Sequence, residues 1–290
     1  TNPYHVLGET PASMFGRKRI FEQVLAQLTK PDPEHLSVVG PKWSGKSVLL
    51  RALAENLHGG ESYVCVVSWD FRSNLPQTDE DFLRQLAGQL SSALRSVGDE
   101  AADLMDVDGD DVLGDLGLAI DEIWQSGHRA LVLMDGFDAV LAADHLTRTL
   151  WDNLLDLARR PGLRLVTASR GRLRELLKHN ARPSIFWEIF SPNPVVLGAF
   201  AAEEFSALTE PFAGRDITFE SSAEKEVFNE SGGHPVLCAA LLSALFDGTA
   251  DGASVNGDAV KECAVAAAEG LQEVCAEIWD ECCAIEAGLI

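Results

Sequence analysis

The eight residues from Gly40 to Ser47 read Gly-Pro-Lys-Trp-Ser-Gly-Lys-Ser and match the pattern G-x-x-x-x-G-K-S. A largely apolar run, 36–39, precedes them, and an apolar, helix-forming run, 48–54, follows. Glycines at both ends of the pattern let the backbone aim successive N–H groups and a helix N-terminus at one point. This order of strand, loop and helix predicts a phosphate-binding loop at the end of a buried strand.

The loop residues have separate expected roles. Lys46 is expected to reach the β- and γ-phosphates of a nucleotide, and the Ser47 hydroxyl to hold Mg²⁺. We therefore expect ATP or ADP and Mg²⁺ as cofactors. The predicted nucleotide-contacting residues of this segment are Gly40, Pro41, Lys42, Trp43, Ser44, Gly45, Lys46, Ser47 and Val48.

A second buried strand ends in an acid. Residues 130–134 are continuously apolar, which is typical of a strand covered on both faces of a parallel sheet, and Asp135 follows them. Ligands of open α/β sheets gather at such strand ends, so Asp135 is expected to bind Mg²⁺ through water. The alternative is a strand-ending Asp-Gly turn.

The position after Asp135 is Gly136, where many ATPases of this class carry the acid that polarises the attacking water. We therefore expect hydrolysis to be slow. Asp138 is the candidate replacement and would act as the base if the chain turns back. The alternative is that Asp138 caps the following helix.

A third strand end follows the run 163–168 and carries Ser169 and Arg170. An arginine there can stabilise charge on a transferring phosphoryl group and report whether that group is present. We expect Arg170 to sense the γ-phosphate. The alternative is an exposed arginine in a basic run with Arg172 and Arg174.

Alternating helical and strand patterns predict the fold class. Helices are expected at about 17–29, 46–57, 79–97, 111–126 and 144–160, and strands at 36–40, 62–69, 130–135, 163–168 and 194–197. Right-handed crossovers then give a five-stranded parallel α/β sheet with helices on both faces. The acidic, glycine-containing segment 97–111 predicts a mobile surface loop.

From about residue 200 the pattern becomes wholly helical, so we expect an α/β domain over 1–199 and an all-helical lid domain over 200–290. Apolar residues recur at helical spacing from 260 to 285, which predicts one helix over 258–286 packed on the core, with a free coiled coil as the alternative. The segment 231–237 predicts a helix-starting loop, which either brings His234 and Pro235 onto the nucleotide or leaves a surface histidine.

Composition limits the partners. The net charge of −22 argues against broad contact with nucleic-acid phosphates, which draws on clustered lysine and arginine, although a small local DNA site stays compatible with it. Six cysteines without a C-x-x-C pair are expected to be reduced thiols. No leader and no apolar stretch of about 20 residues is visible, which predicts a cytoplasmic protein without a membrane segment.

Taken together, these motifs resemble the signal-transducing ATPases with numerous domains (STAND) of bacteria and archaea, over nearly the whole chain. The resemblance adds Asn2-Pro3-Tyr4, Phe15-Gly16-Arg17, Leu197 to Glu204 and Gly233-His234-Pro235 to the motifs above. It implies that Tyr4, Phe15, Gly16 and Arg17 help to hold adenine and ribose, that Arg170 senses the γ-phosphate, and that His234 and Pro235 contact the nucleotide from the lid. A packed N-terminal arm is the alternative for Tyr4 and Phe15.

The resemblance implies an ATP-dependent molecular switch in signalling or antiviral defence. ATP would close the lid and order a surface for homo-oligomerisation or for an effector protein, and slow hydrolysis would reset it. The winged-helix and repeat domains usual in that family are not visible, so we expect either an excised core or separate sensor and effector proteins. The alternatives are an AAA+ ATPase that handles DNA, of the initiator or transposition-helper type, and a non-hydrolysing scaffold with structural nucleotide.

Overall fold

The computed structural model describes residues 1–4, 14–177 and 184–286. The chain forms two compact units. The sheet unit comprises Glu22–Val39 and Leu50–Val196. The helical unit comprises Thr1–Phe21, Gly40–Leu49 and Leu197–Ile290, so it includes the loop 40–47.

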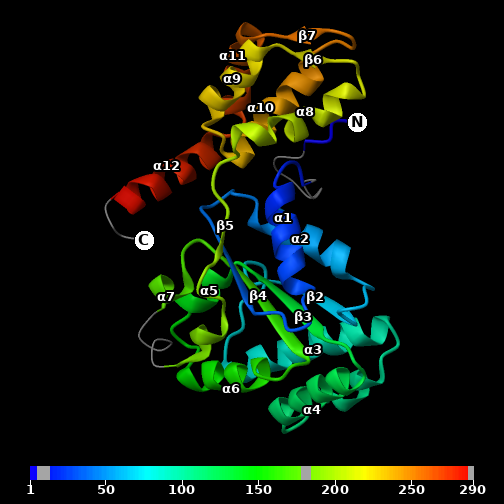
Figure 1. The fold of residues 1–290 in the computed structure, drawn as a ribbon. Helices are drawn as coiled ribbons and strands as arrows, with labels where there is room; N and C mark the ends of the chain where they lie inside the picture. The colour runs from blue at the N-terminus through cyan, green and yellow to red at the C-terminus, as the bar shows by residue number, and fades with distance from the viewer. Residues whose placement is uncertain (5–13, 178–183, 287–290) are drawn as a thin grey trace. The chain divides into compact units, whose positions relative to one another are not determined.

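A five-stranded parallel sheet forms the centre of the sheet unit, in the order β2-β3-β4-β1-β5 (Figure 1). The predicted five-stranded parallel α/β fold is confirmed. The register sets Asp70 opposite Asp135 and Val39 opposite Ser169, so the carboxyl ends of β1 to β4 share one edge. The strands are β1 (Leu36–Val39), β2 (Cys65–Asp70), β3 (Ala130–Asp135), β4 (Leu163–Ser169) and β5 (Val195–Val196).

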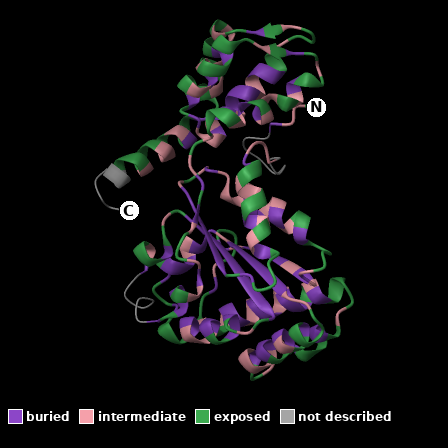
Figure 2. Ribbon diagram, viewed as in Figure 1, coloured by how far each residue is buried: buried purple, intermediate pink, exposed green. Residues whose placement is uncertain are grey.

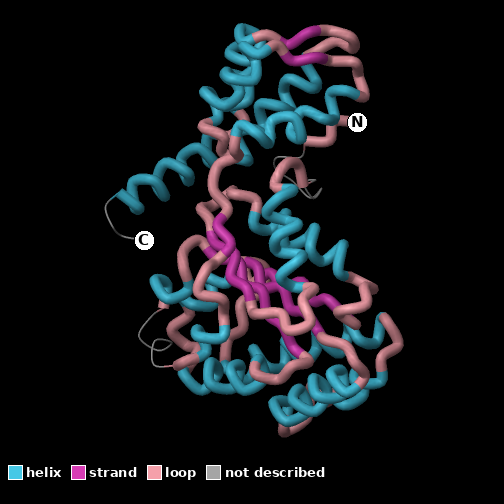
Figure 3. The backbone as a smooth tube through the Cα atoms, in the orientation of Figure 1, coloured by secondary structure: helices cyan, strands magenta, loops and turns pink. Residues whose placement is uncertain are grey.

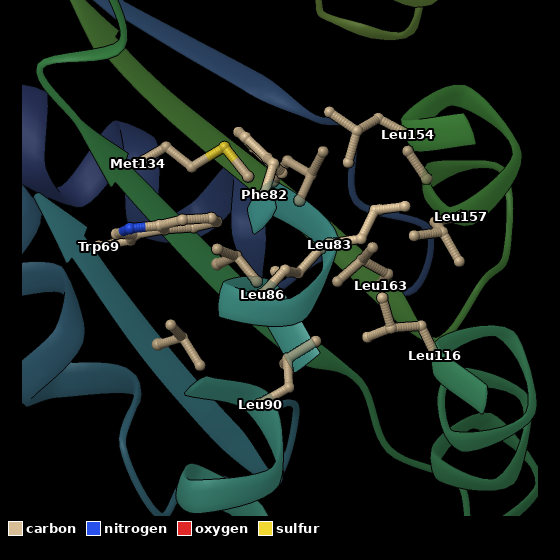
Figure 4. Close-up of a cluster of buried hydrophobic side chains, with 14 of the residues drawn as sticks. Trp69, Phe82, Leu83, Leu86, Leu90, Leu116, Met134, Leu154, Leu157 and Leu163 are labelled. Atoms are coloured by element: carbon tan, nitrogen blue, oxygen red, sulfur yellow. The ribbon is translucent and has the colours of Figure 1, made fainter. Parts of the chain in front are cut away.

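Both faces of the sheet are covered, as the alternation of side chains along β3 shows. Met134 joins a large apolar cluster on one face, whereas its neighbour Leu133 faces the other side and is equally buried. Figure 4 shows Met134 near Trp69 of β2 and near Phe82 and Leu86 of α3. The strands β1, β3 and β4 are buried along nearly all their length, whereas β2 alternates between buried and more exposed residues (Figure 2). This rigid sheet fixes the positions of the residues at its carboxyl edge.

Helices alternate with the strands β1 to β4 along the chain, in the expected order. Figure 3 distinguishes these helices from the strands by colour. The α3 helix begins at a Thr78 cap, whose side chain accepts from the backbone N of Asp81, and its first turn is acidic, as the helix dipole favours. The helices are α1 (Lys18–Leu28), α2 (Lys46–Leu57), α3 (Asp79–Ser96), α4 (Val112–Gln125), α5 (Phe137–Ala142), α6 (Arg148–Ala158) and α7 (Leu173–Leu176), with 3₁₀ turns η1 (Glu100–Leu104) and η2 (Phe186–Ile189).

The segment predicted as a mobile loop, 97–111, instead contains η1. The Asp99 side chain caps this turn by accepting from the backbone N of Ala101. Ala101 and Ala102 are each 1% exposed and belong to the main apolar cluster. The prediction was wrong because the surrounding acids hid a short apolar anchor.

The helical unit is built from α8 (Phe205–Ala213), α9 (Ser221–Ser231), α10 (Pro235–Gly248), α11 (Gly257–Glu269) and α12 (Gln272–Glu286), after a 3₁₀ turn η3 (Ala202–Glu204). It also holds a two-stranded parallel pair, β6 (Thr218–Phe219) and β7 (Ser254–Val255), which sequence analysis did not anticipate. Strands of two residues carry too little periodicity to be recognised.

The predicted single helix over 258–286 is two helices. α11 ends at Glu269, and α12 begins at Gln272 after Gly270 and Leu271. Glycine is a poor interior helix residue, and it allows the chain to leave the α11 axis here. Within the described residues, no helix is long and apolar enough to cross a membrane.

Candidate functional site

The loop Gly40–Ser47 continues directly from the end of β1, and α2 begins at Lys46. Gly45 has φ +91°, a conformation that L side chains rarely adopt. A Cβ on Gly40 would lie 2.3 Å from the carbonyl O of Leu197 and 2.7 Å from Ser44 Oγ. Glycine is therefore required at position 40 by close backbone packing.

The loop fits an anionic ligand. The backbone N of Lys42 donates to Glu281 Oε2 over 2.7 Å, and this carboxylate oxygen stands in for a phosphate oxygen. Ser44 Oγ is buried without a hydrogen-bond partner among the described residues. Lys46 Nζ donates to the carbonyls of Gly40 and Pro41, at 2.7 and 2.8 Å. The loop thus binds an anion through a backbone N–H, while its lysine is folded against its own carbonyls.

The lid loop, Gly232–Pro235, lies in the same unit as the phosphate loop. Gly232 and Gly233 have φ of +57° and +70°, and Gly233 O accepts from the backbone N of Phe200 over 2.7 Å. His234 is the N-cap residue of α10, and Pro235 is its first helical residue, as expected for proline. Burial lowers the pKa of His234. Both of its ring nitrogens are buried without a hydrogen-bond partner among the described residues. Trp43 of the phosphate loop packs against the apolar cluster that contains Val236, two residues after His234, so the start of α10 lies beside this loop.

Arg17 anchors the segment that leads into the helical lid. Its guanidinium donates to the carbonyls of Gly198 and Ala199 and lies 4.5 Å from the centre of the Phe200 ring. Glu204 Oε1 accepts from the Arg17 backbone N over 2.5 Å. Burial lowers the pKa of Arg17, and the charge of Glu204 opposes that shift. Arg17 is 8% exposed, so its described contacts lie within the protein.

Tyr4 and Phe15 lie together in the helical unit, with ring centres 5.0 Å apart. Tyr4 is 4% exposed, and its hydroxyl donates to Leu208 O over 2.5 Å. Its ring also lies 5.7 Å from that of Phe212. Burial raises the pKa of Tyr4. This position matches the packed N-terminal arm, the alternative to contact with a purine, while Gly16 supplies a left-handed turn with φ +65° before Arg17.

The acid end of β3 is paired with an arginine that sequence analysis missed. Arg72 Nη2 donates to Asp135 Oδ2 over 2.7 Å, and Arg72 Nε donates to Asp70 Oδ1 over 2.8 Å. Asp135 Oδ1 accepts from the Gly136 backbone N over 2.9 Å. Burial raises the pKa of Asp70, but the hydrogen bonds from Arg72 outweigh it and hold that pKa below its ordinary value. One guanidinium therefore bridges two adjacent strand ends.

The structure explains why residue 136 is a glycine. It has φ +67° and is the N-cap of α5. A Cβ there would lie 2.8 Å from Arg72 Cγ. An acid at this position would strain the backbone and collide with the arginine that bridges Asp70 and Asp135.

Asp138 and Arg170 form a pair within the sheet unit. Arg170 Nε donates to Asp138 Oδ2 over 2.9 Å, and the Arg170 backbone N donates to Oδ1 over 3.3 Å. Asp138 lies in the first turn of α5 and is not its N-cap. The structure brings Asp135, Asp138 and Arg170 to one edge of the sheet, and it brings the loop 40–47 together with His234 in the helical unit.

The AAA ATPase domain family matches residues 13–167, which include the phosphate loop and Asp135. The chain belongs to this family of AAA ATPase domains, and its fold is that of AAA+-related P-loop ATPases. A comparison with curated proteins found no match.

Solved structures with this fold include the Walker-type ATPase paby2304 of Pyrococcus abyssi, with a TM-score of 0.60, 15% identity, and coverage of 92% of this chain and 76% of that one. Aeropyrum pernix ORC2 in ADPNP–ADP complexes has a TM-score of 0.56 and 16% identity, over 90% of this chain and 70% of that one. Aeropyrum pernix ORC1 in complex with DNA has a TM-score of 0.54 and 13% identity, over 89% of this chain and 67% of that one. At these identities the likeness concerns the fold.

Proposed function

We propose that the protein is an ATP-dependent molecular switch of STAND type, which gates association with further copies of the chain or with a separate effector protein. The observation that carries the proposal is the packing of Trp43, in the loop 40–47, against the apolar cluster that contains Val236, two residues after His234. A ligand on the loop 40–47 would then contact the segment that starts the helical lid. A nucleotide can shift the position of the lid only if it binds one position of the lid more tightly than the other. Contacts of the nucleotide with both the loop 40–47 and the segment at His234 would supply such a difference in affinity.

Each residue of the site has its own proposed role in nucleotide binding or hydrolysis. Lys46 turns from the carbonyls of Gly40 and Pro41 to the β- and γ-phosphates, and the loop N–H groups hold the phosphate oxygens. Mg²⁺, held by Ser47 and Asp135, would neutralise charge on those oxygens. Arg170 reports the γ-phosphate, and Asp138 is the candidate base for slow hydrolysis. We also propose the boundary between the α/β domain and the lid domain at about residue 200.

The nucleotide site is tested by Lys46→Ala, with Lys225→Ala, an exposed lysine of α9, as the charge-matched control. Loss of a charge-assisted contact to phosphate should weaken ATP binding about 10- to 100-fold, measured by titration calorimetry. The control should bind like the wild type. If Lys46→Ala binds ATP with the affinity of the wild type, the loop 40–47 is not the nucleotide site. Asp135→Asn should still bind nucleotide but lose Mg²⁺-dependent turnover, and normal turnover would show that the acid is misplaced.

The switch is tested by hydrogen exchange over residues 200–240 in the apo, ADP and ATP-analogue states. Lid closure on the γ-phosphate should protect this region more with the ATP analogue than with ADP. Mass measurement under the same conditions reports any change of oligomeric state. Identical exchange in all three states would leave a scaffold with structural nucleotide.

A second candidate is an AAA+ ATPase that handles DNA. The fold is shared with an archaeal ORC1 protein solved in complex with DNA. The net charge of −22 opposes broad backbone contact, so this candidate requires a small local site. It predicts ATP-dependent duplex binding that falls steeply with salt, measured by fluorescence anisotropy between 50 and 200 mM salt, about the range over which phosphate contacts are lost. Absence of such binding would remove it.

A further inference from the structure

An acidic face of α12 contacts the phosphate loop within the helical unit. Glu277 and Glu281 are one turn apart and therefore share a side of the helix. Glu281 Oε2 accepts from the backbone N of Lys42 over 2.7 Å. Glu277 Oε1 lies 2.6 Å from Lys42 Nζ, and its Oε2 accepts from Trp43 Nε1 over 2.9 Å. Two carboxylates from one helix thus contact a backbone N–H, an ammonium and an indole of the loop.

The start of α12 is anchored by apolar packing. Leu271 and Val274 are buried against Val236 and Ala240 of α10, and Trp43 packs against this cluster. Trp43 has φ +64°, which is uncommon for a large side chain. The indole is therefore held from two sides, by the apolar cluster and by Glu277. The packing brings the acidic turn of α12 to the loop.

The polar part of the contact is exposed enough to be displaced. The Lys42 and Glu277 side chains are 46% and 42% exposed, and ion pairs of this exposure are weak and sensitive to salt. Hydrogen bonds from Lys42 and Trp43 lower the pKa of Glu277, so its carboxylate stays charged at neutral pH. A polyphosphate carries more negative charge than either carboxylate and also reaches the helix N-terminus.

We propose that α12 is an internal competitor of the nucleotide, with Glu281 and Glu277 holding the phosphate loop in the absence of ligand. The inference rests on the proposed nucleotide site at 40–47 and adds its regulation. A phosphate oxygen that binds the Lys42 N–H displaces Glu281. Lys42 then turns to the phosphate, and Glu277 loses its ammonium partner. Nucleotide binding therefore frees the acidic part of α12, on which Trp279 is already 69% exposed.

The test compares ADP affinity in three forms of the full chain by titration calorimetry. Glu277→Gln with Glu281→Gln removes both charges and keeps the side-chain size. Glu273→Gln with Asp280→Asn removes the same charge from exposed positions of the same helix and is the control. Removal of two exposed charge contacts from the competitor should tighten ADP binding about two- to tenfold, while the control should match the wild type.

A second measurement does not depend on the variants. Hydrogen exchange in the C-terminal half of α12 of the wild type should become faster when ADP is added, because the helix loses its contacts to the loop. Equal affinity in the glutamine variant and its control, or slower exchange of α12 with ADP, would overturn the inference while leaving the nucleotide site intact. If all three forms fail to bind ADP, the proposed nucleotide site is wrong and the inference falls with it.

Discussion

Arg72 and Asp135 are joined across adjacent strand ends by a hydrogen bond of 2.7 Å from Nη2 to Oδ2. The arginine side chain is 57% exposed and the aspartate side chain 13% exposed, so a screened cation lies against a largely buried carboxylate. The carboxylate proposed as a Mg²⁺ ligand thus already has a positively charged partner. Binding of a divalent ion at Asp135 would have to compete with this guanidinium.

Arg72→Gln should therefore lower the Mg²⁺ concentration needed for ATP binding. The expected change is about two- to fivefold, because the arginine of the pair is exposed to solvent and screened, which limits the contribution of the pair to about 1 kcal/mol. Titration of Mg²⁺ at fixed ATP measures it. Arg148→Gln removes another exposed arginine, paired with Asp152 at 3.1 Å, and should have no effect. A higher Mg²⁺ requirement in Arg72→Gln would show that Arg72 positions Asp135 instead of competing for it.

Asp138→Asn should reduce turnover by about 10²- to 10⁴-fold, the usual loss of a general base, with ATP affinity nearly unchanged. Steady-state hydrolysis and calorimetry together measure the two effects. Asp70→Asn is the matched comparison, since Asp70 also binds an arginine at the carboxyl edge of the sheet. Unchanged turnover in Asp138→Asn would show that Asp138 only pairs with Arg170. A loss of turnover in Asp70→Asn alone would identify Asp70 as the base.

Arg170→Ala should abolish the difference between ATP-analogue and ADP in the exchange of residues 200–240. ADP lacks the group that Arg170 is proposed to sense, so ADP affinity should stay within about twofold of the wild type. Arg174→Ala, at an exposed position of α7, is the control. Persistence of the ATP-specific protection in Arg170→Ala would assign γ-phosphate sensing to another residue.

His35 should make the protein less stable in acid. Its Nε2 lies 3.0 Å from Ala158 O, and its Nδ1 accepts from the backbone N of Leu165 over 3.0 Å. Burial, aided by the charge of Arg164, lowers the pKa of His35 to about 4. The unfolded chain takes up the proton first as pH falls below about 6.5, so stability is lost from there down to about 4, by roughly 3 kcal/mol in total.

His35→Gln should remove that part of the pH dependence, although it also lowers stability at pH 7 by disturbing two buried hydrogen bonds. The melting temperature between pH 7 and pH 4 measures the slope. His58→Gln, at an exposed histidine of the sheet unit, should keep the wild-type slope. An unchanged slope in His35→Gln would place the acid sensitivity in other groups.

The sequence could predict those parts of the site whose residues directly follow a recognisable local pattern. The loop 40–47 and Asp135 each follow an apolar run directly, and the strand that carries each of them forms where expected. Arg72 could not be found in this way, because its bond to Asp135 joins residues 63 positions apart. The contact of Glu281 with Lys42 spans 239 positions and depends on the break at Gly270, which an apolar repeat running through it conceals.

The core of the helical unit can be completed only late in the synthesis of the chain. Tyr4 lies in that core, yet its hydroxyl partner Leu208 is 204 residues further along the chain. At about 5–20 residues per second, a ribosome takes roughly 10–40 s to make the intervening chain. Throughout that interval, Tyr4 and Phe15 cannot make their contacts in this core. The strands β1 to β4 and their helices are synthesised in the same interval. The segment that carries Tyr4 can therefore complete this core only after Leu208 has been made, and a fragment that begins at residue 197 would lack part of its own core.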